Sequence, residues 1–583
     1  MSERASGQWL DVPGDVTGDA VVAAMAAGGI EYLFFTSGSE IAFYQEAIAK
    51  AVAQGRKAPK LITVPHEHAS LNAALGYAAV TGRPAATAAH VDVGTLHYGG
   101  AIHTAWRSGL PVLVTAGYPP TAYAGSMPGA RDEGGHLWVQ ENYDQGGIVR
   151  QYTKWDRRLE YQDNPALIVS RALQVARSEP CGPAYLTFPR ELTLLPLRDR
   201  RFPSADQLGI ARPPAVNPEA ARELAERLIA ARHPVAVVSG SGRNPASVAA
   251  LVSLCELLSI AVVDSARLAY LSFPMRHPLY QETSALKGAD VVLVVDADVP
   301  WLPSGNSPPP EAYVAAFGFD PIRGRIPTYE FTADMRLTTD PLSAIRAIEA
   351  AAREQLSGKD TGRLAERAKR LAEVSRQRFA DAERDAISKS NKSPIDPLWV
   401  SYQIGQVLDD NCIVFDDTMP GNRLPRYLRC TRPGSYFSNP GSSGGWSPGA
   451  ALGAKLGAPE RDVVAVTGDG FYMFGTAAPA LWAAAHHKAP FMAVVYTNRS
   501  YSTGTIRLAG LYPDGYAAKS GFVGGYFDPP IDFANEAEAA GAYGENVRDP
   551  ADVGPALKRG LEQVRGGRPA VISVWLPRLL AED

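Results

Sequence analysis

The sequence predicts an α/β protein built from three stacked, doubly wound parallel-sheet domains. Short apolar runs such as residues 291–295 (VVLVV) and 492–496 (MAVVY) are continuous rather than alternating, which is typical of strands buried on both faces. Helical stretches separate these runs through most of the chain, and this alternation favours parallel sheets. Further runs of the same kind are residues 32–35, 112–115, 235–238, 261–263 and 463–466.

Two shifts in composition divide the chain. A chain of 583 residues is too long for one hydrophobic core. Residues 189–218 are rich in proline and arginine, which predicts a linker. Residues 353–392 are charged, with leucine and alanine at helical spacing, which predicts a solvated helix. The predicted units are residues 1–190, 205–350 and 395–583.

Composition excludes several classes of protein. Hydrophobic residues make up 46% and charged residues 20%, and the net charge of -4 gives no basic face for nucleic acid. No apolar run reaches the roughly 18 residues that a membrane span needs, and residues 1–14 are too polar for a secretory signal. The four cysteines form no CxxC pair. We therefore expect reduced thiols in a cytoplasmic protein.

A strand–loop–helix–strand pattern near the C-terminus predicts a metal and diphosphate site. The run 462–466 (DVVAV) leads into Gly468-Asp469-Gly470, and the run 491–496 leads into Asn498. In a parallel βαβ unit both strands end at the same edge of the sheet, where ligands bind. Asn498 follows Asp469 by 29 residues, which suits one helical crossover. A hard cation such as Mg²⁺ prefers such oxygen ligands, and the glycines let the backbone approach an anion.

This segment, GDGFYMF followed by VVYTNRSY, resembles the thiamine-diphosphate signature of the acetolactate synthase, pyruvate oxidase and benzoylformate decarboxylase family. The resemblance implies thiamine diphosphate and Mg²⁺ as cofactors, with Asp469, Asn498 and the carbonyl of Ser500 as metal ligands. It also implies that the three domains are pyrimidine-binding, central and diphosphate-binding. The further residues it assigns to cofactor binding are Gln140, Asp417, Thr418, Met419, Ser443, Gly444, Gly468, Gly470 and Tyr501.

One assigned position departs from the family pattern. The family usually has a bulky apolar residue where Gly444 aligns, and that residue props the cofactor into a V shape. Glycine has no side chain for this purpose. We therefore expect that a neighbour such as Met419 or Trp446 supplies the prop, or that the alignment is shifted.

Glu67 is the expected activating acid. Thiamine chemistry requires proton loss from C2 of the thiazolium, and a carboxyl group at N1′ of the pyrimidine drives the tautomer that removes this proton. A buried glutamate with a raised pKa suits that task. Glu67 follows the run 61–64 and opens a helix rich in small residues, a position that also favours a carboxylate for structural reasons. In the family this glutamate and the metal site meet across a dimer interface, so we expect a homodimer or homotetramer.

Other polar residues near the expected pocket match the decarboxylase pattern. His90 aligns with a pocket histidine that could transfer protons, although a structural histidine is an equal alternative. Ser39 aligns with a loop serine that touches substrate. His97 is a further candidate for substrate contact, and His103 is another candidate for the pocket.

The expected activity is cleavage or formation of a C–C bond beside a carbonyl, by decarboxylation or carboligation of a 2-oxo acid. The expected substrates are small molecules: 2-oxo acids, aldehydes or acyl-CoA-type compounds. The alternatives are a benzoylformate-type decarboxylase, a 2-hydroxyacyl-CoA lyase and a non-catalytic thiamine-binding regulator. A nucleotide-binding protein using the glycine turn at 239–242 is another. The short segment 277–290 favours a central domain without FAD.

Overall fold

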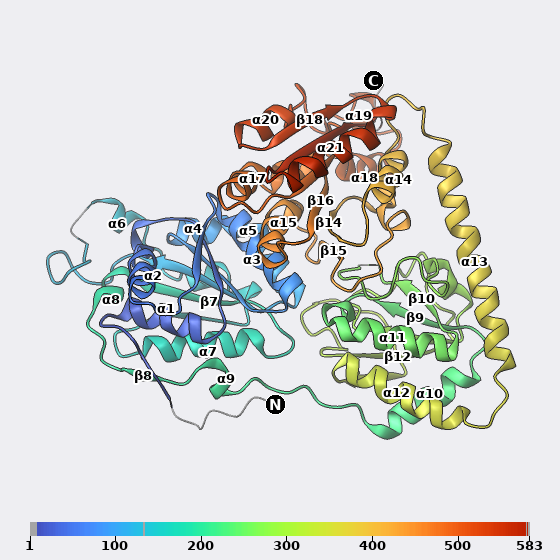
Figure 1. The fold of residues 1–583 in the computed structure, drawn as a ribbon, viewed down its shortest axis with the longest axis horizontal. Coiled ribbons are helices and arrows are strands. Elements are labelled where there is room, and N and C mark those ends of the chain that lie inside the picture. Colours follow the sequence, from blue (N-terminus) through green and yellow to red (C-terminus); the bar gives the residue numbers. More distant parts are fainter. Residues whose placement is uncertain (1–8, 132–133, 267, 579, 581–583) are drawn as a thin grey trace.

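The computed structural model describes residues 9–131, 134–266, 268–578 and 580. Within this part of the chain, three parallel sheets each carry helices, and each sheet belongs to one of three units (Figure 1). The structure thus confirms the predicted α/β class. A short antiparallel pair joins β1 (Leu10–Asp11) to β8 (Arg201–Phe202), so part of the predicted linker is tied to the first unit.

The first sheet has the order β3-β2-β4-β5-β7-β6. Its strands are β2 (Tyr32–Phe35), β3 (Lys60–Thr63), β4 (Ala85–Ala89), β5 (Val112–Tyr118), β6 (Trp155–Arg158) and β7 (Ala184–Pro189). One face packs on α1 (Thr17–Ala27), α2 (Phe43–Ala53) and α7 (Pro165–Arg177). The other face packs on α3 (Glu67–Thr81) and α5 (Gly99–Ser108). The shorter helices are α4 (Asp92–His97), α6 (His136–Val139), α8 (Arg190–Leu194) and α9 (Ala205–Leu208).

The central sheet has the order β10-β9-β11-β12-β13. Its strands are β9 (Pro234–Val238), β10 (Ala261–Asp264), β11 (Val291–Val295), β12 (Tyr313–Gly318) and β13 (Met335–Thr338). One face packs on α10 (Pro218–Ala230), α11 (Pro245–Leu258) and α12 (Pro341–Leu356). The other face is covered by η5 (Thr283–Gly288) and by loop side chains such as Trp301.

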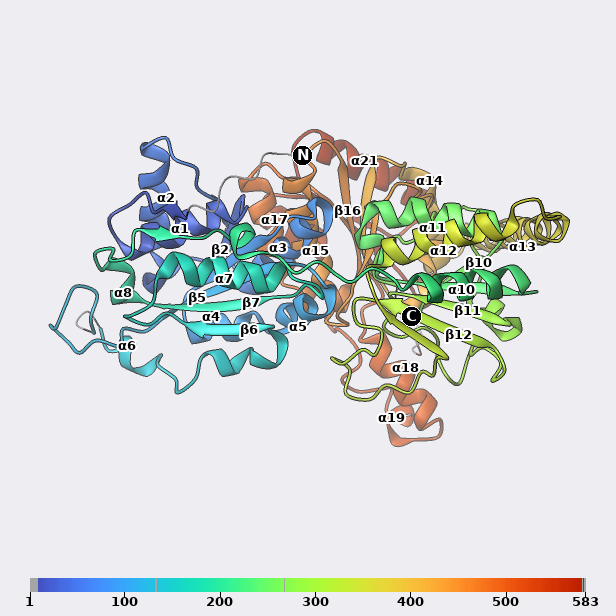
Figure 2. The same ribbon diagram turned by 90° about the horizontal axis from the view of Figure 1, so that it is seen from below.

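The third sheet has the order β15-β14-β16-β17-β19-β18. Its strands are β14 (Cys412–Asp417), β15 (Tyr436–Ser438), β16 (Asp462–Gly468), β17 (Met492–Thr497), β18 (Tyr543–Val547) and β19 (Ala570–Trp575). α14 (Pro397–Val407) and α21 (Val553–Arg565) pack on one face. α15 (Trp446–Gly457), α17 (Ala477–His486) and α20 (Phe533–Ala539) pack on the other. The remaining helices are α16 (Asp469–Phe474), α18 (Ser502–Leu511) and α19 (Tyr516–Lys519); Figure 2 shows α18 and α19 projecting from this unit.

The first and third units are joined by α3 and α15, which run parallel in close contact. Gly449 lies against Ala69, and Gly453 lies against Ala73 one turn further along. Gly457 then lies against Thr81. Because the register advances in the same direction on both helices, their N-termini lie at the same end of the pair. The start of α3 is therefore placed beside the glycine-rich stretch that precedes α15.

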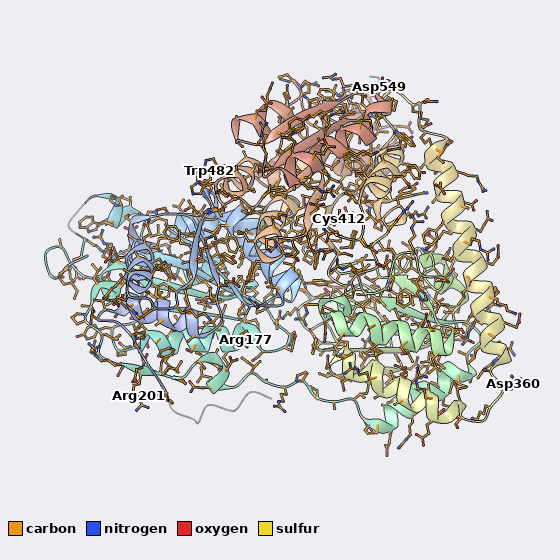
Figure 3. All side chains as sticks on the ribbon, viewed as in Figure 1. Arg177, Arg201, Asp360, Cys412, Trp482 and Asp549 are labelled. Carbon is orange, nitrogen blue, oxygen red and sulfur yellow. The ribbon has the colours of Figure 1, made fainter. Side chains whose placement is uncertain are left out.

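Most of the charged segment 353–392 forms a long outer helix, while its first residues belong to the end of α12. α13 (Gly362–Ile387) runs along the outside of the molecule from the central unit toward the third unit (Figure 1). Across the described residues, no helix is both long enough and apolar enough to cross a membrane. All four cysteines are free and buried, including Cys412 within the third unit (Figure 3).

Candidate active site

Asp469 and Asn498 follow neighbouring strands that end at the same edge of the third sheet. β16 and β17 pair in parallel up to Gly468 and Tyr496. The Asp469 carboxylate accepts hydrogen bonds from the backbone N–H groups of Gly470, at 2.8 Å, and Arg499. It is only 2% exposed. The strand pairing thus brings the predicted metal ligands to one place, as the βαβ spacing required.

The loop after β17 presents a compact set of oxygen atoms. The Asn498 side-chain oxygen accepts from the Ser500 N–H at 3.0 Å and from the Ser500 hydroxyl at 2.9 Å. Burial raises the pKa of Asp469 to about 6, even though backbone amides donate to it. A bound cation would offset this cost of burying a carboxylate. A carboxylate, an amide oxygen and a carbonyl form a hard donor set that fits Mg²⁺.

A cavity of about 480 Å³ opens at this edge of the third sheet. A side chain at Gly468 would meet nothing within 4 Å, so the backbone is open to a ligand there. Within the described part of the chain, every lining residue belongs to the third unit. The predicted site residues that line the cavity are Asp417, Met419, Gly468, Asp469, Gly470, Asn498, Ser500 and Tyr501.

Asp417 holds the start of α15 in place. One carboxylate oxygen accepts from the backbone N–H groups of Gly445, at 2.8 Å, and Trp446, at 2.9 Å. The other accepts from the side chain of Asn439 at 2.9 Å. Burial raises the pKa of Asp417 to about 6. Thr418 is held differently, because its hydroxyl donates to Asp416 at 2.7 Å.

The space beside Gly444 is filled by an aromatic ring. A Cβ atom at Gly444 would stand 2.2 Å from Cδ1 of Phe471. Trp446 was one of the two residues predicted to support the cofactor in place of Gly444. That prediction is wrong for Trp446, because its side chain faces the core. It is 4% exposed and packs edge-on against Phe415, with ring centroids 5.2 Å apart. Met419 does line the cavity. Ser443 lies against Gly100 of the first unit.

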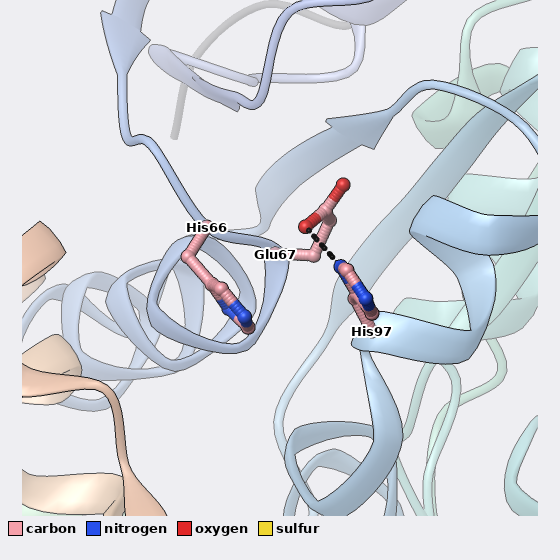
Figure 4. Close-up of side chains that lie close together, drawn as sticks. All are labelled: His66, Glu67 and His97. Atoms are coloured by element: carbon pink, nitrogen blue, oxygen red, sulfur yellow. Dashed lines mark hydrogen bonds and ion pairs between the residues drawn. The ribbon is translucent and has the colours of Figure 1, made fainter. Parts of the chain in front are cut away.

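Glu67 begins α3 and lies beside two histidines. Its carboxylate is 3.3 Å from Nδ1 of His97, and the residue is 7% exposed (Figure 4). The rings of His66 and His97 are stacked, with centroids 5.2 Å apart. His97, predicted to touch substrate, therefore lies against the predicted activating acid. The other pocket candidate, His103, packs edge-on against Tyr152.

A second polar cluster joins Ser39 and His90 through a residue that the sequence reasoning missed. Glu40 is 1% exposed and accepts from the Ser39 hydroxyl at 2.9 Å and from Nε2 of His90. Burial would raise the pKa of Glu40, but the hydrogen bond from His90 and its charge lower it to about 2. Gln140 interacts with the same carboxylate. The sequence contained a signal for Glu40, since this charged residue directly follows the candidate Ser39.

Comparison with known proteins agrees with this arrangement. Residues 16–148 match the N-terminal thiamine pyrophosphate binding domain of thiamine pyrophosphate enzymes, and residues 421–574 match the C-terminal one. The chain is 28% identical to benzoylformate decarboxylase of Pseudomonas aeruginosa, over 87% of this chain and 90% of the relative. It is 26% identical to sulfoacetaldehyde acetyltransferase of Castellaniella defragrans, over 97% and 94%. Acetolactate synthase of Bacillus subtilis is 24% identical, over 93% and 90%.

Solved structures share the fold along nearly the whole chain. The 4-hydroxybenzoylformate decarboxylase of Rhodococcus jostii RHA1 superposes with a TM-score of 0.77 at 21% identity, covering 97% of this chain and all of that one. Benzoylformate decarboxylase of Polynucleobacter necessarius gives 0.76 at 17% identity, covering 98% and 100%. Fold and site together define a thiamine pyrophosphate enzyme. This chain belongs to the thiamine-diphosphate-dependent family that includes acetolactate synthase and benzoylformate decarboxylase.

Proposed function

We propose that this enzyme uses thiamine diphosphate and Mg²⁺ to decarboxylate a 2-oxo acid, and then releases the remaining fragment as an aldehyde or joins it to an acceptor. The observation that carries the proposal is the cluster of Ser39, Glu40 and His90 in the unit that also holds Glu67. A hydroxyl and an imidazole oriented by a buried carboxylate suit binding of a carboxylate and transfer of a proton.

The third unit supplies the anchor for the cofactor. Asp469, Asn498 and the carbonyl of Ser500 would hold Mg²⁺, and the open backbone at Gly468 leaves room for a diphosphate. When bound, thiamine diphosphate supplies a nucleophilic carbon and accepts the electron pair released when a bond beside a carbonyl breaks. The protein provides position, exclusion of water and control of protons.

Glu67 would hold the proton that it shares with the pyrimidine, and His97 orients its carboxylate from 3.3 Å away. His90 would move a proton at the substrate. The Ser39 hydroxyl lies 3.3 Å from Nε2 of His90 and donates to the same Glu40 carboxylate. Glu40 keeps the imidazole in its orientation. The cluster around Glu67 would act on the cofactor, and the cluster around His90 would act on the substrate.

A second copy of the chain would complete this site. The cavity beside Asp469 is lined only by residues between Pro397 and Pro577 in the described chain, and Glu67 is not among them. A homodimer in which each chain brings its Glu67 to the other chain's cavity accounts for both halves. A homotetramer would contain the same pair twice.

The central unit is proposed to be structural. A cavity of about 110 Å³ lies between it and the first unit, and ion pairs line that cavity. Arg243 binds Glu179 at 2.8 Å, and Arg323 binds Asp298 at 2.9 Å. The Arg243–Glu179 pair fastens the central unit to the first unit beside this cavity, and the Arg323–Asp298 pair lies within the central unit. A cavity this small and lined by ion pairs favours a domain without FAD. It also disfavours the 2-hydroxyacyl-CoA lyase, because its substrate carries a nucleotide.

The test begins with the purified protein, denatured to release its small molecules. We expect thiamine diphosphate to be recovered after incubation with Mg²⁺. The holoenzyme is then supplied with a panel of aliphatic and aromatic 2-oxo acids, with and without an acceptor aldehyde. Release of CO₂ from at least one 2-oxo acid is the expected result. Cofactor binding without CO₂ release from any of them would contradict the proposed reaction and favour a non-catalytic regulator.

A further inference from the structure

The cofactor imposes a shape requirement that this chain must meet. Thiamine diphosphate carries its reactive carbon on one ring and its basic 4′-amino group on another, and a single methylene joins the rings. The amino group reaches the C2 proton only when the molecule is bent. Rotation about the methylene bonds is free in solution, so the protein must hold the bend by packing against it.

The position expected to provide this packing has no side chain. Gly444 lies in the stretch before α15, and its neighbour Gly445 has a φ of +85°, a conformation that glycine adopts without strain. A Cβ atom at Gly445 would stand 2.2 Å from the Cα atom of Gly475. The glycine-rich stretch therefore lies directly against the helix α16, which begins with Asp469.

The ring of Phe471 occupies the volume that a side chain at Gly444 would need. An added Cβ atom would stand 2.2 Å from Cδ1, 2.5 Å from Cγ and 2.7 Å from Cε1 of that ring. Contacts this short leave no room for both side chains. Phe471 also lines the cavity beside Asp469 and Gly470. The ring thus connects the Gly444 position to the cofactor cavity.

The other nearby apolar side chains do not take this place. Trp446 is buried against Phe415 in the core. Met419 is 37% exposed, and its sulfur accepts a hydrogen bond from the hydroxyl of Thr503, in α18, at 3.1 Å. The three heavy atoms nearest to a Cβ atom added at Gly444 all belong to Phe471.

We propose that Phe471 is the positioning residue that holds the cofactor in its bent, reactive shape, in place of the side chain that Gly444 lacks. This proposal rests on the proposed use of thiamine diphosphate. It predicts that Gly444→Leu restores the apolar support for the cofactor when the Phe471 ring has been removed.

The test uses four full-length proteins: wild type, Phe471→Ala, Gly444→Leu and the double variant. Two readouts need no substrate. One is the affinity of the apoenzyme for thiamine diphosphate with Mg²⁺, by calorimetry. The other is the rate at which the C2 proton of the bound cofactor exchanges with deuterium, by quenched-flow NMR. Phe474→Ala removes a matched aromatic ring from the same helix, one that is 58% exposed and lies against His68 instead.

In Phe471→Ala the exchange rate should fall by about 100-fold, because a misplacement of about 1 Å has an effect of that size. The diphosphate anchor is intact, so affinity should fall less than the exchange rate. Gly444→Leu should lower the melting temperature of the apoenzyme through overpacking. The double variant should recover most of the exchange rate, and Phe474→Ala should keep the wild-type rate.

Wild-type exchange in Phe471→Ala would overturn the proposal. So would a double variant no faster than Phe471→Ala, or a Met419→Ala variant that alone abolishes exchange. Phe471→Leu is measured as well, because it keeps apolar bulk at this position if Phe471→Ala does not fold. A wild-type rate of C2 proton exchange in both Phe471 variants would also overturn the proposal. If wild type binds no thiamine diphosphate at all, the proposed function fails instead, and the two failures are distinct.

Discussion

Gly453 of α15 lies directly on the backbone of Ala73 of α3, so close that a Cβ atom would stand 1.7 Å from the Ala73 carbonyl oxygen. We expect Gly453→Ala to push the two helices apart and to reduce the free energy of unfolding by about 1–3 kcal/mol. Urea denaturation of the apoprotein measures this loss. Gly504→Ala is the matched control, because nothing lies within 4 Å of that position in α18. The control should be neutral or slightly stabilising.

Removal of the Asp469 charge should abolish Mg²⁺-dependent cofactor binding. Loss of an outer partner of a metal ligand weakens affinity by roughly 10–100-fold, so Asp469→Asn should raise the Kd for thiamine diphosphate by more than about 100-fold. Calorimetry with and without Mg²⁺ measures the effect. Asp514→Asn removes the same charge from an exposed loop and should bind normally. Normal affinity in Asp469→Asn would remove this residue from the metal site.

Glu67→Gln should separate binding from turnover. The amide keeps the size of the side chain but cannot share a proton with the pyrimidine. We expect an affinity for thiamine diphosphate near that of wild type, with turnover reduced by at least about 100-fold. Steady-state decarboxylation and calorimetry on the same preparations test this. Glu46→Gln, on the exposed side of α2, is the control. Unimpaired turnover in Glu67→Gln would show that another group activates the cofactor.

Glu40 should act through His90 and not directly on the substrate. His90→Ala should reduce turnover by about 100-fold. Glu40→Gln leaves the imidazole present but removes the buried charge that orients it, so we expect a smaller loss of turnover and a pH profile shifted toward lower pH. Equal profiles for wild type and Glu40→Gln would rule out the orienting role.

His68 should make the apoprotein sensitive to mild acid. Burial lowers the pKa of His68 to about 4 from an ordinary value of 6.5, and the side chain hydrogen-bonds to the backbone of Gly475. The unfolded chain therefore takes up the proton first as the pH falls. The contribution of neutral His68 to the free energy of unfolding is fully present above pH 6.5. It is lost as the pH falls from 6.5 to 4, by about 3 kcal/mol. Urea titrations across this range should show a shallower slope for His68→Gln.

Much of the proposed metal site follows from local pattern. The continuous apolar runs before Asp469 and Asn498 predicted parallel neighbouring strands, and the crossover spacing predicted that both would end at one edge. Glu67 was predictable as a helix start after a strand. These features depend on residues close together in sequence, where strand and helix periodicity largely determine the geometry. The shorter strands with weaker patterns, such as β6, β15 and β18, were not predicted.

The sequence by itself determined the fold class, the residues of the two halves of the proposed cofactor site and the absence of a side chain at Gly444. Only the tertiary structure decided that Phe471 fills that space, that Trp446 faces the core, and that Glu40 joins Ser39 to His90. It also placed the starts of α3 and α15 side by side. The physical reason is that these relationships depend on which side chains share a small volume, and packing between distant segments determines that.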